Sequence, residues 1–204
     1  MTATLLALAT EIRPGYTRFL GSCKHQGITP IIVEMGSAWW GFGWRFKRLI
    51  AAIKSLNTEL ILHCDAFDSV CLRNLPTAIE NFAELNHAWV FSYEAWPQAE
   101  EYLHLNCGMW MANRDYALSI ITDQWLEEFF PDHFNDQYQM QAIYSWHPDW
   151  FKLDKQSMLF YTQNAYSEDL VELNGKMVSP ASGTTPCFVH GPNKSSLANV
   201  DASG

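Results

Sequence analysis

The sequence predicts a single α/β domain whose mixed, mostly parallel sheet is flanked by helices. The chain has 204 residues, which fits one domain because about 100 to 200 residues per domain is usual. Hydrophobic residues make up 48% of the sequence and charged residues 17%, so the chain can bury a sizeable core. In the first half, apolar strand patterns alternate with helical patterns, and this order gives right-handed crossovers and a parallel sheet.

Three strands and two helices are predicted in the first half. Pro14 and Gly15 open the first helix, and Gly27 ends it. A loop of Gly and aromatic residues, Gly36 to Gly43, precedes the second helix. The carboxyl ends of such strands form a ligand crevice. The strands are expected at 5–10, 29–35 and 59–64, and the helices at 16–26 and 44–56.

The second half of the chain is less regular. A strong apolar segment covers 108–112, and Pro131 ends a long helix. The small, polar composition of 195–204 indicates a flexible tail, so one domain is expected over 1–194. Helices are predicted at 75–85, 114–129 and 135–146, and strands at 88–92, 157–161 and 187–190, the last two completing the sheet.

Charge and cysteine content exclude several classes of protein. The net charge of −9 argues against nucleic-acid binding, which needs clustered Lys and Arg. The five cysteines are irregularly spaced, which predicts reduced, buried thiols and no disulfide framework. The apolar start is short and has no preceding Lys or Arg, so we expect a core strand and no signal peptide. No apolar run has the length of a transmembrane segment, and a cytoplasmic location is expected.

Two carboxylates follow the third predicted strand. Asp65 and Asp68 lie three residues apart, and a turn at this point brings such residues within about 7 Å at Cα. Two carboxylates this close repel each other unless a cation lies between them, and Mn²⁺ or Mg²⁺ prefer oxygen ligands. The alternative is an Asx turn in which Asp65 caps the next helix.

A second polar group follows the last predicted strand. His190 ends that strand and is followed by Gly191, Asn193 and Lys194. Taken alone, such a histidine is more often structural, and Lys194 more often a solvated residue. Gly191 lets the backbone approach a ligand closely, while Asn193 and Lys194 are donors suited to phosphate oxygens.

The nine tryptophans divide into two groups. Trp39 lies in the Gly-rich loop, where an indole can stack on a nucleobase or sugar; the alternative is a hydrophobic plug against the sheet. Three roles are considered for Trp96, which lies beside Pro97: a surface on which the acceptor binds, a lid over the site, or a core residue. Core positions are expected for Trp110, Trp125 and Trp146, which lie in apolar patterns.

Several ordered blocks over about residues 5–195 carry a family resemblance. They are Ala9-Thr10-Glu11 with Gly15-Tyr16-Thr17-Arg18-Phe19-Leu20, Asp65-Ala66-Phe67-Asp68, Glu94-Ala95-Trp96-Pro97, Leu105-Asn106-Cys107-Gly108, Asp136-Gln137, and Val189-His190-Gly191 with Asn193-Lys194. These blocks resemble the glycosyltransferase domain of the procollagen lysyl hydroxylases and its viral and bacterial GT-A relatives. The chain departs from that pattern at Cys107, where a Ser is usual, at Asn135 within an acidic run, and at the inserted Pro192.

The resemblance implies a Rossmann-like GT-A fold and a set of site residues. Asp65, Asp68 and His190 become ligands of Mn²⁺ or Mg²⁺. The other implied roles are as follows: Thr10 borders the uracil, Trp39 stacks on the base, Arg45, Gly191, Asn193 and Lys194 face the diphosphate or sugar, and Asn106, Asp136 and Gln137 line the sugar and acceptor side.

The activity implied by the resemblance is Mn²⁺-dependent transfer of a hexose. The donor is a nucleotide sugar, UDP-glucose or UDP-galactose, and the acceptor is a hydroxyl group of a glycan or of hydroxylysine type. Asp136 handles the acceptor hydroxyl. Two alternatives remain: a non-catalytic nucleotide-sugar-binding protein would bind UDP without releasing it from a sugar, and a metal-dependent phosphohydrolase would show no preference for a uridine diphosphate sugar.

Overall fold

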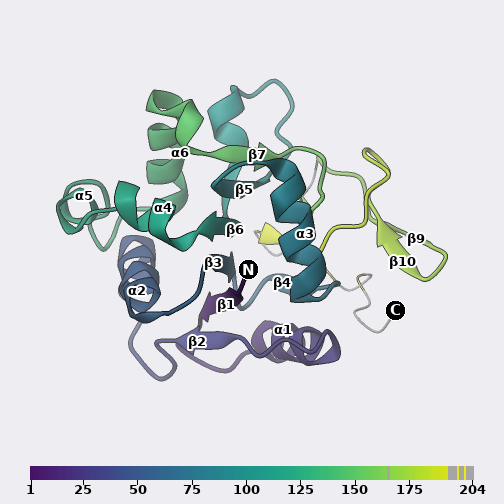
Figure 1. Cartoon of the computed structure of the whole chain (residues 1–204), viewed down its shortest axis with the longest axis horizontal. Helices are drawn as coiled ribbons and strands as arrows, with labels where there is room; N and C mark the ends of the chain where they lie inside the picture. The colour runs from purple at the N-terminus through teal and green to yellow at the C-terminus, as the bar shows by residue number, and fades with distance from the viewer. Residues whose placement is uncertain (165, 193–196, 198–199, 201–204) are drawn as a thin grey trace.

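A six-stranded mixed sheet forms the centre of the molecule. The computed structural model describes residues 1–164, 166–192, 197 and 200. Strands β1, β2 and β3 run parallel, as predicted, whereas β6 is antiparallel to both of its neighbours. The sheet order is β2 (Ile31–Val33), β1 (Ala3–Leu8), β3 (Leu60–Cys64), β6 (Leu105–Asn113), β5 (Trp89–Tyr93) and β7 (Lys152–Asp154) (Figure 1).

Helices cover both faces of this sheet (Figure 1). Because successive side chains on a strand alternate between faces, Ile61 packs with Phe46 on one face and Leu62 packs with Phe19 and Phe82 on the other. The first face carries α2 (Phe42–Ser55), α4 (Arg114–Ile120), α5 (Asp123–Phe129) and α6 (Asp136–Trp146), and the second carries α1 (Pro14–His25) and α3 (Leu75–Leu85).

A second, three-stranded sheet corrects one prediction. We expected strands at 157–161 and 187–190 to complete the central sheet, but they lie in a separate sheet. Its order is β4 (Ser69–Cys71), β11 (Phe188–His190) and β8 (Phe160–Thr162). The chain turns sharply after β3, and the short strand β4 that follows pairs with β11, which places His190 opposite Ser69. A hairpin of β9 (Val171–Leu173) and β10 (Lys176–Val178) lies apart from both sheets.

The predicted helix over 114–129 is also wrong as a single element. The chain leaves the helix at Ile121, whose side chain is buried, and a new helix starts when the Thr122 hydroxyl accepts a hydrogen bond from the Trp125 amide. This capping favours a helix start at Thr122 over continuation. Two short one-turn helices, η1 (Glu101–His104) and η2 (Pro148–Trp150), complete the described elements.

The tryptophan predictions are confirmed in part. Trp110 is fully buried and Trp125 packs against the core. Trp146 is 61% exposed, so its core assignment is wrong. It is the last residue of α6, where the helix has passed the edge of the core that Met140 and Ile143 enter.

Three further observations concern the ends and the thiols. All five cysteines are free and buried, as expected. No helix in the described ranges has both the length and the apolar character that a bilayer crossing needs. Of the predicted tail, 195–204, the structure describes Leu197 and Val200, and both are buried against β11 and its neighbours.

Candidate functional site

A cavity of about 790 Å³ opens where strands of both sheets end. It lies at the carboxyl end of β3, which is the location predicted for a ligand crevice. Four carboxylates and one guanidinium line it among the described residues, together with His190, Asn106 and Gln137. The charged groups are Arg45, Asp65, Asp68, Glu94 and Asp136.

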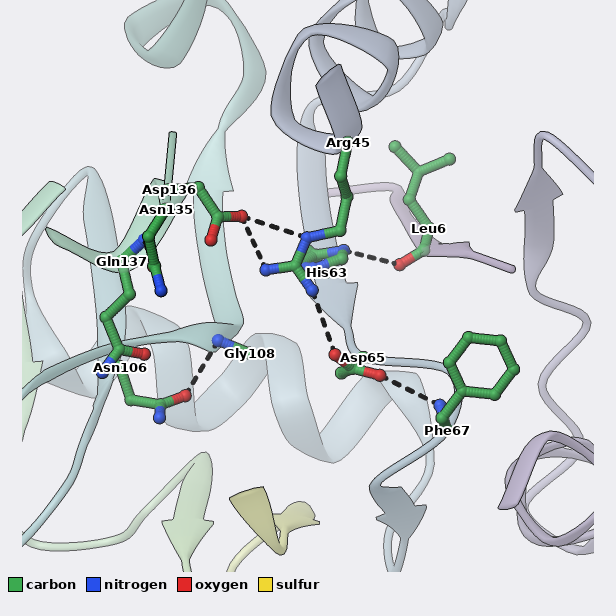
Figure 2. Close-up of polar contacts among 10 residues, drawn as sticks. All are labelled: Leu6, Arg45, His63, Asp65, Phe67, Asn106, Gly108, Asn135, Asp136 and Gln137. Carbon is green, nitrogen blue, oxygen red and sulfur yellow. Dashed lines mark hydrogen bonds and ion pairs between the residues drawn. The ribbon is translucent and has the colours of Figure 1, made fainter. Parts of the chain in front are cut away.

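Arg45 connects two of these carboxylates. Its Nε and Nη2 atoms donate to Asp136 Oδ2 at 3.0 and 2.6 Å, and its Nη1 atom donates to Asp65 Oδ2 at 3.0 Å (Figure 2). The guanidinium is almost completely buried and also lies 5.1 Å from the centre of the Phe42 ring. Although burial acts to lower the pKa of Arg45, the charges of Asp136 and Asp65 raise it, so the group stays protonated.

Glycines at the start of α2 explain how Arg45 reaches Asp136, which is 91 positions later in the sequence. A Cβ atom at Gly41 would lie 2.3 Å from the Asp132 carbonyl oxygen, and one at Gly43 would lie 2.0 Å from the Pro131 carbonyl oxygen. The amide of Gly43 donates to the Phe134 carbonyl at 2.9 Å. The first turn of α2 therefore packs backbone against backbone on the segment that leads into α6.

The start of α6 fixes Asp136 itself. Asn135 caps the helix, because its Oδ1 atom accepts a hydrogen bond from the Gln137 amide at 2.9 Å. Cys107 donates from its buried thiol to the backbone oxygen of Asp136 at 3.7 Å. Two of the departures from the family pattern thus contact the backbone that positions Asp136.

The turn after β3 brings Asp65 and Asp68 to the cavity. Asp65 Oδ1 accepts a hydrogen bond from the Phe67 amide at 3.0 Å, so the Asx turn considered as the alternative is present, but the next element is strand β4 and not a helix. Burial acts to raise the pKa of Asp65, but the charge of Arg45, the neighbouring His190 and the hydrogen bond from the Phe67 amide together lower it. Burial and the charge of Asp65 raise the pKa of Asp68.

Packing against Gly108 and a backbone hydrogen bond from the next residue hold His190 in place. Its ring packs against Gly108, where an added Cβ would lie 2.1 Å from His190 Cε1. The next amide, that of Gly191, donates to the Asp68 backbone oxygen at 2.8 Å. Burial lowers the pKa of His190, which favours the neutral ring, and its Nδ1 atom is buried without a hydrogen-bond partner among the described residues. A neutral imidazole with a free nitrogen is suited to ligate a metal.

His63 lies outside this group. Its Nδ1 atom is 3.3 Å from the Leu6 carbonyl oxygen on the neighbouring strand. Burial, and next the positive charge of Arg45, lower the pKa of His63 to about 3, which keeps the ring neutral.

The donor types of the predicted metal set fit a divalent cation. Two carboxylates and a neutral imidazole are ligands that Mn²⁺ accepts, and the unpartnered His190 Nδ1 and the raised pKa of Asp68 both indicate a local need for positive charge. Within the described ranges, however, no three His, Cys, Asp or Glu side chains are arranged so that they could hold a metal ion. Asp65 is instead paired with Arg45.

Glu94 is a cavity residue that sequence reasoning assigned no role. It follows β5, is 1% exposed, and accepts a hydrogen bond from Asn106 Nδ2 at 2.7 Å. Asn164 Nδ2 donates to the other carboxylate oxygen at 3.3 Å. Asn106 in turn accepts from the Gly108 amide at 2.8 Å (Figure 2), so its side chain is fixed at both ends. The signal that could have found Glu94 was its place at the carboxyl end of a predicted strand.

The remaining predicted residues lie at the rim of the cavity or beyond it. Trp39 is 46% exposed and contacts the ring of Phe42, which lines the cavity, edge to face at 5.2 Å. Thr10 follows β1, and its carbonyl accepts a hydrogen bond from the Gly36 amide at 3.0 Å. Neither Thr10 nor Trp39 is among the described lining residues. Asn193 and Lys194 lie outside the described residues.

Comparison with known proteins identifies the family. Residues 1–201 match the family model described as the PLOD GT domain. The chain belongs to this family. The predicted resemblance is thereby confirmed: this PLOD GT domain is a GT-A glycosyltransferase domain of the lysyl hydroxylase type.

One curated relative of this PLOD GT domain is the procollagen-lysine,2-oxoglutarate 5-dioxygenase of Drosophila melanogaster. The two sequences are 26% identical over 232 positions. The match covers 97% of this chain but 31% of the relative, so the chain spans about a third of that protein's length.

Two solved structures share the fold. One is a glycosyltransferase involved in the glycosylation of the major capsid of PBCV-1, with a TM-score of 0.59, 17% identity and coverage of 98% of this chain and 96% of the other. The other is A197 from STIV, with a TM-score of 0.52, 10% identity and coverage of 96% and 97%. At these identities the likeness shows the fold alone.

Gly108→Ala tests how the PLOD GT domain positions His190. The added methyl group overlaps the imidazole, and overpacking of this kind costs about 1–3 kcal/mol, so we expect a lower free energy of unfolding in urea denaturation. Gly21→Ala is the control, because nothing lies within 4 Å of its added Cβ in helix α1; there we expect a gain of up to about 1 kcal/mol. If Gly108→Ala were as stable as Gly21→Ala, His190 would not be packed as described.

Proposed function

We propose that this domain transfers a hexose from a UDP-sugar to a hydroxyl acceptor with the help of Mn²⁺. The single observation that carries the proposal is the cavity itself, where Arg45, Asp65, Asp68 and His190 converge at the carboxyl end of β3. Breaking the bond between the sugar and the diphosphate releases an anion, and such a site must offset the charge that develops.

Asp65, Asp68 and His190 would hold the cation, either Mn²⁺ or Mg²⁺. When bound, the ion would supply Lewis-acid stabilisation of the departing diphosphate. The protein itself contributes one guanidinium to the described cavity lining, that of Arg45. This shortage of positive charge is the physical reason to propose a metal. UDP-glucose or UDP-galactose is proposed as the donor on the ground of the family.

Asp136 is the proposed group on the acceptor side. Its Oδ2 atom is bound to Arg45, and the carboxylate lines the cavity. We assign Oδ1 to accept a hydrogen bond from the acceptor hydroxyl, as general base if the reaction inverts configuration. If configuration is retained, Asp136 orients the sugar and the leaving phosphate takes the proton. Asn106 and Gln137, which also line the cavity, would bind the sugar hydroxyls.

Residues at the rim of the cavity and beyond it are proposed to bind the nucleotide of the donor. Trp39 would stack on the uracil that Thr10 borders, since its indole is exposed next to the lining residue Phe42. Gly191, which follows His190 and is buried beside Asp68, would let the backbone approach the diphosphate. Asn193 and Lys194 are proposed to donate to the phosphate oxygens.

The proposed acceptor is a hydroxyl group of a protein side chain or a glycan. The Drosophila relative is named for procollagen lysine and the PBCV-1 enzyme for capsid glycosylation, which supports a hydroxyl on a protein side chain or a glycan. The net charge of −9 gives no support to nucleic acid as a partner. Five free, buried thiols support a reducing, cytoplasmic location.

A binding and turnover experiment tests the proposed function. Thermal shift with UDP, GDP and their sugars, with and without Mn²⁺, should show stabilisation by uridine nucleotides with Mn²⁺, about 2.7 kcal/mol at 100 times the dissociation constant. UDP release from UDP-glucose or UDP-galactose should then depend on Mn²⁺. Asp68→Asn should abolish that release, whereas Asp149→Asn, at an exposed site on η2, should not.

Other results of these measurements would indicate one of the alternative functions. Uridine nucleotide binding without UDP release would show a non-catalytic binding protein. Phosphate ester hydrolysis without preference for a uridine diphosphate sugar would show a phosphohydrolase. Normal Mn²⁺-dependent turnover in Asp68→Asn would remove that carboxylate from the proposed metal set.

Trp39→Ala tests base stacking. We expect UDP affinity in the presence of Mn²⁺ to fall by about 1–3 kcal/mol, the usual value of an aromatic–base stack, as measured by calorimetric titration. Trp40→Ala is the matched control, because the indole of Trp40 is next in the sequence, is 66% exposed and has no proposed contact with the nucleotide. Equal UDP affinities for wild type and Trp39→Ala would assign Trp39 to loop packing alone.

A further inference from the structure

The charge of the cavity lining is unbalanced. Four carboxylates and one guanidinium line the cavity among the residues that the structure describes, and no lysine does. Within this described lining, Arg45 is therefore the counter-ion of a strongly acidic pocket. Its position decides which carboxylate is neutralised and which is available to an arriving cation.

Arg45 binds its two partners unequally. Asp136 receives two hydrogen bonds on one oxygen, at 3.0 and 2.6 Å, whereas Asp65 receives one, at 3.0 Å. Asp136 is also the more buried carboxylate, with a side chain 4% exposed against 18% for Asp65. The link to Asp65 is thus the weaker one and the one that the cavity can reach.

We propose that Arg45 is an exchangeable counter-ion, a positioning residue that neutralises Asp65 until the donor binds and then releases it to the incoming cation. This inference rests on the proposed function. In the exchange the guanidinium keeps its two bonds to Asp136, and the third N–H, freed from Asp65, donates to the diphosphate. No covalent bond changes; one ion pair, Arg45 with Asp65, is replaced by two, Asp65 with the cation and Arg45 with the diphosphate.

The exchange makes metal and nucleotide binding cooperative. A cation alone must break the Arg45–Asp65 pair and leave the guanidinium N–H without its carboxylate, so it binds weakly. When a diphosphate binds together with the cation, the diphosphate becomes a new anionic partner for Arg45. By linkage, UDP then tightens Mn²⁺ binding and Mn²⁺ tightens UDP binding by the same factor.

Calorimetric titration of Mn²⁺ alone, and of Mn²⁺ in saturating UDP, tests this exchange. In Arg45→Gln, Mn²⁺ alone should bind about tenfold more tightly than in the wild type, because a competing positive charge is gone. The factor by which UDP tightens Mn²⁺ binding should shrink in the same variant. Arg48→Gln removes a positive charge from the same helix, where Arg48 pairs with Glu34 and not with Asp65, and should change neither quantity.

Arg45→Gln leaves Asp136 buried without its counter-ion. A second pair of variants therefore tests the exchange in case Arg45→Gln does not fold. Asp136→Asn and the double variant Arg45→Gln/Asp136→Asn differ only in Arg45, and the double variant should bind Mn²⁺ alone more tightly. Equal Mn²⁺ affinities with and without Arg45, or an unchanged effect of UDP, would overturn the exchange. Failure of the wild type to bind Mn²⁺ and UDP together would instead overturn the proposed function as well.

Discussion

The buried ion pairs of Arg45 are the interaction on which the site depends. Asp65 follows a strand in the first half of the chain, and Asp136 begins a helix in the second half. Asp136 is almost completely shielded from water and Asp65 is partly shielded, and leaving a buried charge unpaired costs several kcal/mol. The guanidinium of Arg45 neutralises both carboxylates (Figure 2). It therefore fixes the distance between Asp65, which is proposed to bind the metal, and Asp136, which is proposed to bind the acceptor.

Much of the surrounding backbone serves to place these groups. Gly41 and Gly43 let α2 contact the 131–134 segment so closely that no side chain fits between them. Gly15 does the same for α1, since a Cβ there would lie 1.9 Å from the Phe67 carbonyl oxygen in the turn between Asp65 and Asp68. Gly108 leaves room for the ring of His190. Four close approaches, each needing glycine, therefore hold the segments that carry cavity residues.

Local patterns in the sequence predicted most of the elements and the family. The parallel β1, β2 and β3, both carboxylates of the turn and the location of the cavity follow from strand order and spacing. Sequence could not predict the separate sheet of β4, β11 and β8, because three-residue strands carry too little periodicity to show their partners. It also could not predict that Arg45 bridges Asp65 and Asp136, since a long side chain reveals its contacts only after distant segments have packed.

A double-mutant cycle on Arg45 and Asp136 tests the central claim most directly. Free energies of unfolding of the wild type, Arg45→Gln, Asp136→Asn and the double variant give the coupling between the two side chains. Because the pair is buried and doubly hydrogen-bonded, we expect each single change to destabilise and the coupling to be about 2–3 kcal/mol. Additive effects, with a coupling below about 0.5 kcal/mol, would contradict the account.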